Sequence, residues 1–360
     1  MQKTELRYFA CANSCRGFIN YFPSVLRNMD RIFILKGGPG TGKSTLMKRI
    51  GWYFSEQGEP IEYIYCSSDS SSLDGIILRE KRIAVVDGTA PHVIEPTAPG
   101  ACEEYVNLGV CWDREKLVPY REEILDLQGK IKKEFKEIYS ILAESKKIYD
   151  RWSGIYRENR DEEKLEQVAE SVQREIFRDL VPTGRTGMVT DRFFAALTPE
   201  GMVHYIENLT EGVGVRYFLK GAPGTGKSEL MKALLDAAEK HGVVAEVYHS
   251  CLDADQIGLL VLRELDVCIF DAMPPWEVFP SREGDIMVDL YTSVIASPTE
   301  DENQATLSLL LREYEDCMRD AGSHLARVHH LHDALEEYYI HAVNFNEIEQ
   351  LTEDIITKIE

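Results

Sequence analysis

The chain has 360 residues, 44% hydrophobic and 28% charged, which predicts two globular domains that each bury a core. It lacks both the run of about 18 apolar residues that a membrane span needs and the apolar start of a signal peptide, so we expect a cytoplasmic protein with reduced cysteines and no membrane partner. The formal net charge of −21 is concentrated in residues 181–360, which hold 13 Lys and Arg against 32 Asp and Glu and are not expected to bind nucleic acid.

Each half of the chain predicts the same succession of elements. A strand leads into a helix, whose start in the second half is marked by Thr198, Pro199 and Glu200. A second strand then enters a glycine-rich loop and a helix, and strands that alternate with helices in this way predict a parallel sheet. The expected strands of the two halves are 8–12 and 193–197, 32–35 and 216–219, 62–65 and 245–248, and 82–87 and 266–271, with short helical pieces at 73–80 and 256–264.

The pattern changes after the last predicted strand of each half. Residues 114–157 and 303–342 each read as one long helix, and in 303–342 apolar or small residues keep a 3,4 spacing typical of a coiled coil. A shorter helix closes each half, with Asn346 as the predicted N-cap of the last one. Because the apolar stripes are too continuous to face water, we expect these arms to pack on each other, on a second copy of the chain or on a protein partner.

The two halves also resemble each other residue by residue. Residues 36–100 align with 220–284 without a gap, and 21 of the 65 positions are identical. Upstream, RYFA at Arg7 resembles RFFA at Arg192 with a slip of one residue. The sequence thus predicts an α/β protein of two tandem domains with parallel sheets. The expected domains are 1–180, with an arm at about 114–178, and 188–360, with an arm at about 303–360; the breaker-rich stretch 181–187 separates them.

Both halves contain the motif G-x-x-x-x-G-K-[S/T], as KGGPGTGKSTLMK from Lys36 and KGAPGTGKSELMK from Lys220. Glycines let backbone N–H groups curl around a phosphate, the motif lysine contacts the β- and γ-phosphates, and the serine binds Mg²⁺, so we expect ATP and Mg²⁺ as cofactors. The predicted binding residues are Gly37, Gly38, Pro39, Gly40, Thr41, Gly42, Lys43, Ser44 and Thr45, and Gly221, Ala222, Pro223, Gly224, Thr225, Gly226, Lys227, Ser228 and Glu229.

An aspartate lies 44 residues beyond each motif lysine, at the end of an apolar strand. There it suits a Mg²⁺ site, although a turn or helix-cap aspartate is the alternative. Asp87 and Asp271 are followed by Gly88 and Ala272, where many P-loop ATPases have a water-positioning glutamate. His92 is a candidate substitute, or simply a surface loop residue. The catalytic candidates are therefore Lys43, Asp87, His92, Lys227 and Asp271, and the metal candidates are Ser44, Asp87, Ser228 and Asp271.

Both halves look like P-loop NTPases. The whole arrangement, including DGTAPH from Asp87 and the TPEG turn from Thr198, is similar to an uncharacterised family of bacterial tandem P-loop ATPases. The resemblance covers nearly the entire chain and implies ATP binding and ATPase activity. The sequence lacks an N-K-x-D or T-K-x-D guanine signature, so GTP specificity is disfavoured.

Three functions remain open from the sequence. The first is an ATP-driven or ATP-gated conformational switch with two nucleotide sites, to which Arg79 and Arg263 could add charge across an interface or else pair locally. The second is a phosphotransferase whose acceptor site is shaped by 69–80 and 253–264, and the third is a scaffold that binds ATP without hydrolysing it. The first loop is followed by Thr45 and by DGTAPH, whereas the second has Glu229 and Trp276, so we expect the amino-terminal site to carry most turnover.

Overall fold

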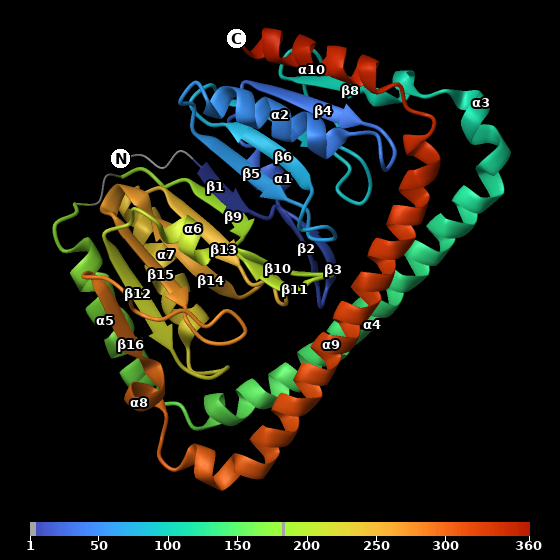
Figure 1. Ribbon diagram of the computed structural model, residues 1–360. Helices are drawn as coiled ribbons and strands as arrows, with labels where there is room; N and C mark the ends of the chain where they lie inside the picture. The colour runs from blue at the N-terminus through green and yellow to red at the C-terminus, as the bar shows by residue number, and fades with distance from the viewer. Residues whose placement is uncertain (1–4, 182–183) are drawn as a thin grey trace.

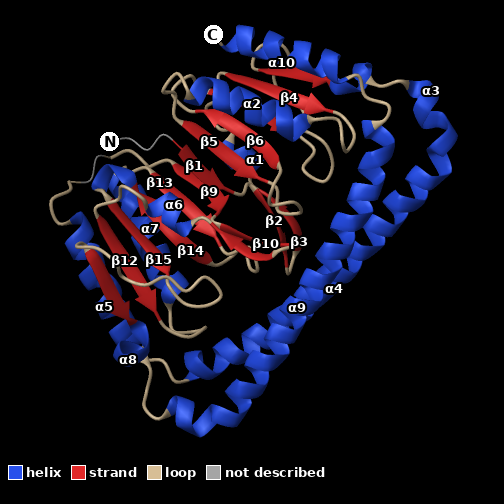
Figure 2. Ribbon diagram, in the orientation of Figure 1, coloured by secondary structure: helices blue, strands red, loops and turns tan. Residues whose placement is uncertain are grey.

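The computed structural model describes residues 5–181 and 184–360 (Figure 1). Residues 1–4 of the first predicted domain, and residues 182 and 183 of the predicted boundary, lie outside this part. The described chain is mixed α/β, with two six-stranded, mostly parallel sheets and two long helices that run together along one side (Figure 2). None of its helices is both long enough and apolar enough to cross a membrane.

The two sheets repeat one strand order. The first is ordered β1-β5-β6-β7-β4-β8 and the second, read from the matching edge, β9-β13-β14-β15-β12-β16. The first sheet comprises β1 (Glu5–Tyr8), β4 (Arg31–Lys36), β5 (Ile61–Tyr65), β6 (Leu73–Leu78), β7 (Ile83–Asp87) and β8 (Glu103–Asn107). The second comprises β9 (Val189–Phe193), β12 (Val215–Lys220), β13 (Ala245–His249), β14 (Ile257–Leu262), β15 (Val267–Asp271) and β16 (Asp285–Asp289).

One strand in each sheet is antiparallel to its neighbours. The sequence predicted a short helical piece at this place in each half, and that prediction was wrong. The segments 73–80 and 256–264, expected as short helical pieces, contain β6 and β14, which pair antiparallel on both sides. Every residue of both strands is buried. A short apolar run that is buried on both faces has no alternation, so its periodicity cannot distinguish a strand from a helix.

The helix expected to start at Thr198 is also absent, because this stretch is a hairpin turn. It joins β10 (Ala195–Thr198) to β11 (Gly201–His204). Thr198 Oγ1 accepts a hydrogen bond from the Glu200 N–H and donates one to the Gly201 carbonyl, and Gly201 takes a φ of 103°. A Thr-Pro-Glu signature therefore started a turn here rather than a helix. The first half has the matching hairpin of β2 (Cys11–Ser14) and β3 (Gly17–Asn20), and the short helices α1 (Phe22–Val25) and α6 (Ile206–Thr210) follow the hairpins.

The two sheets meet edge to edge between β1 and β9. The Phe9 N–H donates to the Phe193 carbonyl at 2.9 Å, and the Phe193 N–H donates to the Phe9 carbonyl at 2.8 Å. Tyr8 pairs with Ile64 in the first sheet, and Arg192 pairs with Tyr248 in the second. Each residue of the second pair lies 184 residues beyond its equivalent in the first. The offset of 184 therefore continues upstream of the loops without the predicted slip, and Arg192 stands where the first half has Tyr8.

Arg192 lies at the centre of a buried charge cluster at this junction. Its guanidinium is 3.3 Å from the Glu62 carboxylate and 3.4 Å from that of Glu246, and the side chains of all three are largely buried. Arg79 donates two hydrogen bonds to the Glu62 carboxylate, and Arg263 donates two to the Glu246 carboxylate. Burial alone would raise the pKa of Glu62, but Arg192 and Arg79 outweigh burial and lower it to about 2.

The long helices α4 (Arg121–Glu158) and α9 (Thr299–Ile340) run antiparallel and pack along their length. Their middle part buries Ile138, Leu142, Ala321, Leu325 and Val328 together with Leu197 of the second hairpin. The predicted arms at 114–157 and 303–342 are therefore helical and pack on each other within one chain. The short α3 (Arg114–Leu117) precedes α4, and α8 (Leu290–Val294) precedes α9.

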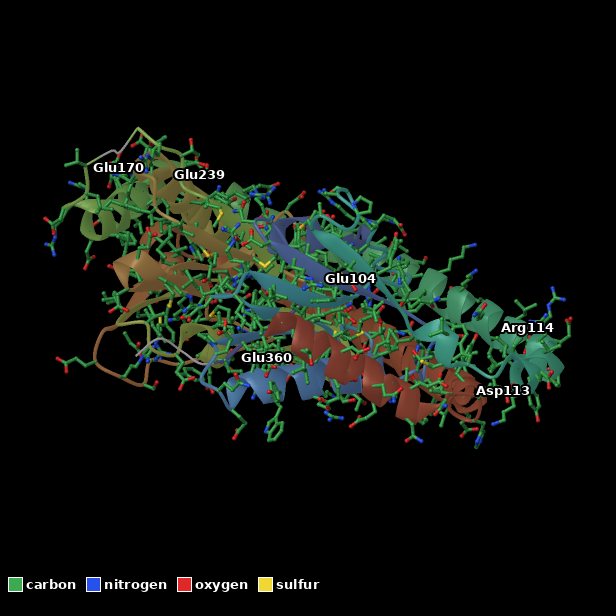
Figure 3. All side chains as sticks on the ribbon, turned by 90° about the horizontal axis from the view of Figure 1, so that it is seen from above. Glu104, Asp113, Arg114, Glu170, Glu239 and Glu360 are labelled. Carbon is green, nitrogen blue, oxygen red and sulfur yellow. The ribbon has the colours of Figure 1, made fainter. Side chains whose placement is uncertain are left out.

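Each arm ends on the opposite half of the molecule. The first arm (α4 and the following α5, Glu162–Phe177) delivers α5 to α7 (Lys227–His241), which follows the second glycine loop. The second arm (α9 and α10, Phe345–Ile359) delivers α10 to α2 (Lys43–Ser55), which follows the first. Near the carboxyl terminus, Lys358 of α10 pairs with Glu104 of β8 in the first sheet; Figure 3 labels Glu104 and Glu360 in the view from above.

The exchanged helices complete the apolar cores of the halves that receive them. On α10, Ile348, Ile355, Ile356 and Ile359 pack with the core beside α2. On α5, Leu165, Val172 and Phe177 pack with the core beside α7. The N-cap of α10 is Asn344, not the predicted Asn346: the Asn344 side chain accepts from the Asn346 N–H at 3.2 Å.

Replacing Arg192 with Met should lower the free energy of unfolding by about 3–5 kcal/mol, because two buried carboxylates lose their shared cation. Lys147→Met, which breaks the exposed Lys147–Glu144 pair, is the matched control and should cost at most about 1 kcal/mol. Denaturant unfolding measures both variants. Equal, small losses would show that the junction does not depend on the charge cluster.

Cleavage at a protease site inserted into 181–187 should leave the two pieces bound, because each carries a helix that is buried in the other. Size-exclusion chromatography after cleavage should give one peak of unchanged elution volume. The same cut in a chain carrying Ile348→Asp and Ile355→Asp is the control and should weaken the association. Separation of the pieces of the chain without these two substitutions would contradict the exchange of helices.

Candidate functional site

Each glycine loop lies between a central strand and a helix. The first glycine loop, 37–42, joins β4 to α2, and the second, 221–226, joins β12 to α7. Gly40 and Gly42 take φ values of 65° and 81°, and Gly224 and Gly226 take 89° and 105°. These left-handed conformations strain any residue with a Cβ and turn successive N–H groups toward one side.

The motif lysine of each loop folds back toward the loop and the strand-ending aspartate. Lys43 Nζ donates to the carbonyls of Gly37 and Gly38, at 3.0 and 2.7 Å, and lies 3.5 Å from Asp87 Oδ2. Lys227 Nζ likewise bonds the Gly221 carbonyl and lies 3.2 Å from Asp271 Oδ2. Burial raises the pKa of Asp271 despite the neighbouring lysine. The structure thus brings together the lysine and the aspartate predicted for each site.

The motif serine ties the helix start to the antiparallel strand. Ser44 Oγ accepts from the Leu73 N–H, and Ser228 Oγ accepts from the Ile257 N–H, both at 3.0 Å. The antiparallel strand therefore starts beside the loop, and Arg79 and Arg263 lie beyond its far end, in the charge cluster of the junction. Neither arginine is placed to reach a glycine loop of this chain.

His92 is buried in an ion pair rather than exposed on a loop. Its Nε2 lies 3.3 Å from Asp74 Oδ1, and both side chains are less than a tenth exposed. Burial would lower the pKa of His92, but the carboxylate of Asp74, with that of Asp87, outweighs burial and raises it to about 9. The ring is therefore protonated at neutral pH and has no free lone pair with which to accept a proton from water.

The second half replaces this ion pair by an aromatic pair. Trp276 stands at the position of His92, and its ring makes an edge contact with Phe194 at 4.8 Å between centroids. Gly258 stands at the position of Asp74, and a Cβ there would lie 2.3 Å from the Phe194 ring. The swap of His92 for Trp276 is thus matched by changes around it, which is the behaviour of a packing site.

Residues that the sequence did not single out cover both loops. Glu336 Oε1, from the last turns of α9, accepts from the Gly40 N–H at 3.1 Å, and a Cβ on Gly38 would lie 3.0 Å from the Tyr339 ring. On the other side, Arg160 Nη1 donates to the Gly224 carbonyl at 3.1 Å, and a Cβ on Gly224 would lie 2.1 Å from the Ser153 carbonyl oxygen. Each loop is therefore in contact with the arm of the opposite half.

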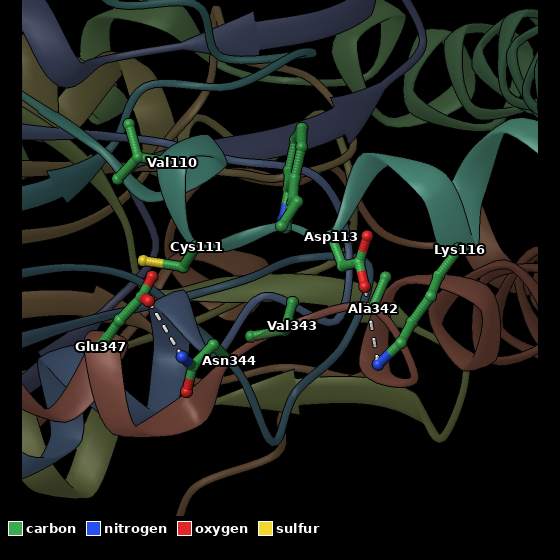
Figure 4. Close-up of a pocket in the computed structure, with 9 residues that line it drawn as sticks. Val110, Cys111, Asp113, Lys116, Ala342, Val343, Asn344 and Glu347 are labelled. Atoms are coloured by element: carbon green, nitrogen blue, oxygen red, sulfur yellow. Dashed lines mark hydrogen bonds and ion pairs between the residues drawn. The ribbon is translucent and has the colours of Figure 1, made fainter.

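A cavity of about 470 Å³ lies where the second arm meets the first half (Figure 4). Its lining includes Trp112 and Val343, which form an antiparallel bridge, and Asn344 and Glu347, which bond each other. The Trp112 ring of this lining contacts the Tyr339 ring at 5.6 Å between centroids, and both rings lie against Gly38 of the first glycine loop. Across the described residues, we find no group of three or more His, Cys, Asp or Glu side chains arranged to hold a metal ion.

Comparison with known proteins gives one finding. A family model described as nephrocystin 3, N-terminal, matches residues 15–77. The matched stretch includes the first glycine loop and ends in β6. No curated protein and no solved structure matches the chain.

The His92 imidazole should titrate with a midpoint near 9 in an NMR pH series. Since the folded-state pKa lies above the unfolded value of about 6.5, the stabilisation by this pair is complete below that value and is lost as the pH rises through 9. Asp74→Asn should lower the midpoint, whereas Asp191→Asn, which removes the partner of His249, should leave it unchanged. A midpoint near 6.5 in the unmodified protein would contradict the ion pair.

Proposed function

We propose that the protein binds Mg·ATP at both glycine loops and works as an ATP-driven or ATP-gated switch. The observation that carries this proposal is the contact of each loop with the arm of the opposite half. A ligand seated in a loop cannot avoid these arm residues, so its binding energy differs between arm positions. Such a difference is what a ligand needs to shift a conformational equilibrium.

The loop residues fit a nucleotide phosphate. The Gly40 N–H already donates to an anionic oxygen, that of the Glu336 carboxylate. Lys43 and Lys227 supply a positive charge, while Ser44 with Asp87 and Ser228 with Asp271 are the groups that would hold Mg²⁺. The bound nucleotide supplies a phosphoryl group whose charge these residues would stabilise. In both halves the lysine lies between the loop carbonyls and the aspartate, within reach of either.

The arms give the switch its mechanical link. Because α4 and α9 pack along their length, a shift at the end of one helix changes the surface that it presents to the other. The second arm leaves the second sheet through α8 and reaches the first glycine loop. The first arm leaves the first half and reaches the second glycine loop. Occupancy of one loop is therefore coupled to the position of an element rooted in the other half.

A second candidate is a scaffold that binds ATP without hydrolysing it. It is favoured by His92, which faces Asp74 and carries a proton, and by Gly88 and Ala272, which follow the two aspartates without a carboxylate. The phosphotransferase alternative loses the element expected to shape its acceptor site, because 73–78 and 257–262 are buried strands. Phosphate release without an added acceptor separates the switch that hydrolyses ATP from the scaffold.

Replacing Lys43 and Lys227 together with Ala should weaken Mg·ATP binding by about tenfold to 100-fold at each site, the worth of a hydrogen bond from a charged donor. The matched control is Lys48→Ala with Lys232→Ala, five residues further along α2 and α7, where both side chains are exposed. Isothermal titration calorimetry measures the affinity. Binding at unchanged affinity in the Lys43 and Lys227 double variant would refute the assignment of the loops.

A further inference from the structure

The two arms bring opposite charges to the two glycine loops. At the first loop the arm residue in contact is an acid, Glu336, whose carboxylate accepts from the Gly40 N–H. At the second loop it is a base, Arg160, whose guanidinium donates to the Gly224 carbonyl. The two loops themselves are nearly identical in sequence, so this difference comes from the arms.

The contrast is between structurally equivalent positions. The bridge between Trp112 and Val343 beside the first loop has its equivalent in the bridge between Arg160 and Ile295 beside the second, with both partners offset by 183 residues. Arg160 thus stands where the second arm has Val343. By the same offset, Glu336 stands where the first arm has Ser153. Each loop faces one charged arm residue that the other loop lacks.

The environment of Arg160 holds its guanidinium at the loop. The side chain is 6% exposed, and Glu162 fixes it through Nε at 3.0 Å and Nη2 at 2.8 Å. Nη1 remains for the Gly224 carbonyl and for the carboxylate of Glu229 at 3.3 Å. Glu162 and Glu229 are half or more exposed, so water screens their charge more than it screens that of Arg160. A phosphate at the loop can replace Glu229 as the partner of Nη1 without moving the guanidinium.

Glu336 has the reverse effect at the first loop. Its carboxylate occupies a backbone N–H of the kind that binds phosphate, and its charge repels an approaching triphosphate. His332 Nδ1, one turn earlier on α9, lies 3.4 Å from Glu336 Oε1, the same oxygen that accepts from Gly40, and so links the carboxylate to its own helix. The nucleotide must therefore displace Glu336, and the end of α9 with it, before the first loop can close on a phosphate.

We propose, on the basis of the proposed function, that the exchanged arms make the loops unequal: Arg160 makes the second loop the tighter site for the nucleotide phosphates, and Glu336 holds the first loop in a low-affinity state until the end of α9 withdraws. Arg160 acts as a positioning and specificity residue supplied by the opposite half. The proposal ranks the two loops by affinity, whereas the expectation from the sequence, which placed most turnover at the amino-terminal loop, ranks them by rate.

Two single-site proteins test this by calorimetric titration with Mg·ATP. Lys43→Ala leaves the second loop intact and should bind at least tenfold more tightly than Lys227→Ala, which leaves the first loop intact. In the Lys227→Ala protein, Glu336→Gln should tighten binding about tenfold. In the Lys43→Ala protein, Arg160→Gln should weaken binding about tenfold, and Arg160→Lys should restore part of the loss, because it keeps the charge but not the planar fork.

Neighbouring exposed residues of the same arms provide the controls. Glu337→Gln and Arg157→Gln change the same charges where the side chains face water, and they should leave both affinities unchanged. Glu229→Gln, also exposed in part, keeps the test decisive if the Arg160 variants unfold: removing the competing carboxylate should tighten the second site.

The outcomes separate the inference from the function on which it rests. If neither the two single-site proteins nor the unmodified chain bind Mg·ATP, the proposed function fails. If both bind equally, and the variants at Glu336, Arg160 and Glu229 change nothing, nucleotide binding stands and the inference is overturned. Tighter binding at the first loop than at the second would overturn it as well.

Discussion

The structure depends on the exchange of the helices that follow the two arms. Helix α10 buries four isoleucines beside the first glycine loop, and α5 buries Leu165, Val172 and Phe177 beside the second. Neither half completes its core with its own segment, so the halves are linked by apolar burial at both ends of the molecule as well as by the edge pairing of Phe9 with Phe193. The long packed helices α4 and α9 follow from this constraint, because each must carry its terminal helix across to the other half.

The same exchange determines which residues contact the glycine loops. The glycines of a phosphate-binding loop are commonly explained by the backbone conformation alone, and here Gly40 and Gly224 do have positive φ values. Both also lie against the opposite arm, where a Cβ would meet the carbonyl oxygens of Glu336 and Ser153. The loop sequence therefore satisfies two conditions at once: it takes left-handed backbone conformations and admits a helix end.

Much of this architecture could be predicted from the sequence, for physical reasons that particular residues show. The strands that lead to the loops, the lysine–aspartate pairs and the arms were predictable because motif spacing and helical periodicity are local properties. Strand β6 was not, since a segment buried on both faces carries no alternation, and the turn at Thr198 was not, since Thr-Pro-Glu starts turns as well as helices. Arg160 and Glu336 were not predictable as loop contacts, because nothing local shows which half a helix after a 40-residue arm will join. The domain limits 1–180 and 188–360 remain a prediction about the repeat in sequence.

The central claim is that a nucleotide in one loop acts on an arm rooted in the other half. Hydrogen–deuterium exchange of the Lys227→Ala protein, with and without Mg·ATP, tests it most directly, because nucleotide can then be held by the first loop alone. We predict that the nucleotide changes exchange in residues 330–345, at the end of the second arm, as well as in the first loop and α2. A change confined to residues 31–108, with the end of α9 and the start of α10 unaffected, would contradict the account.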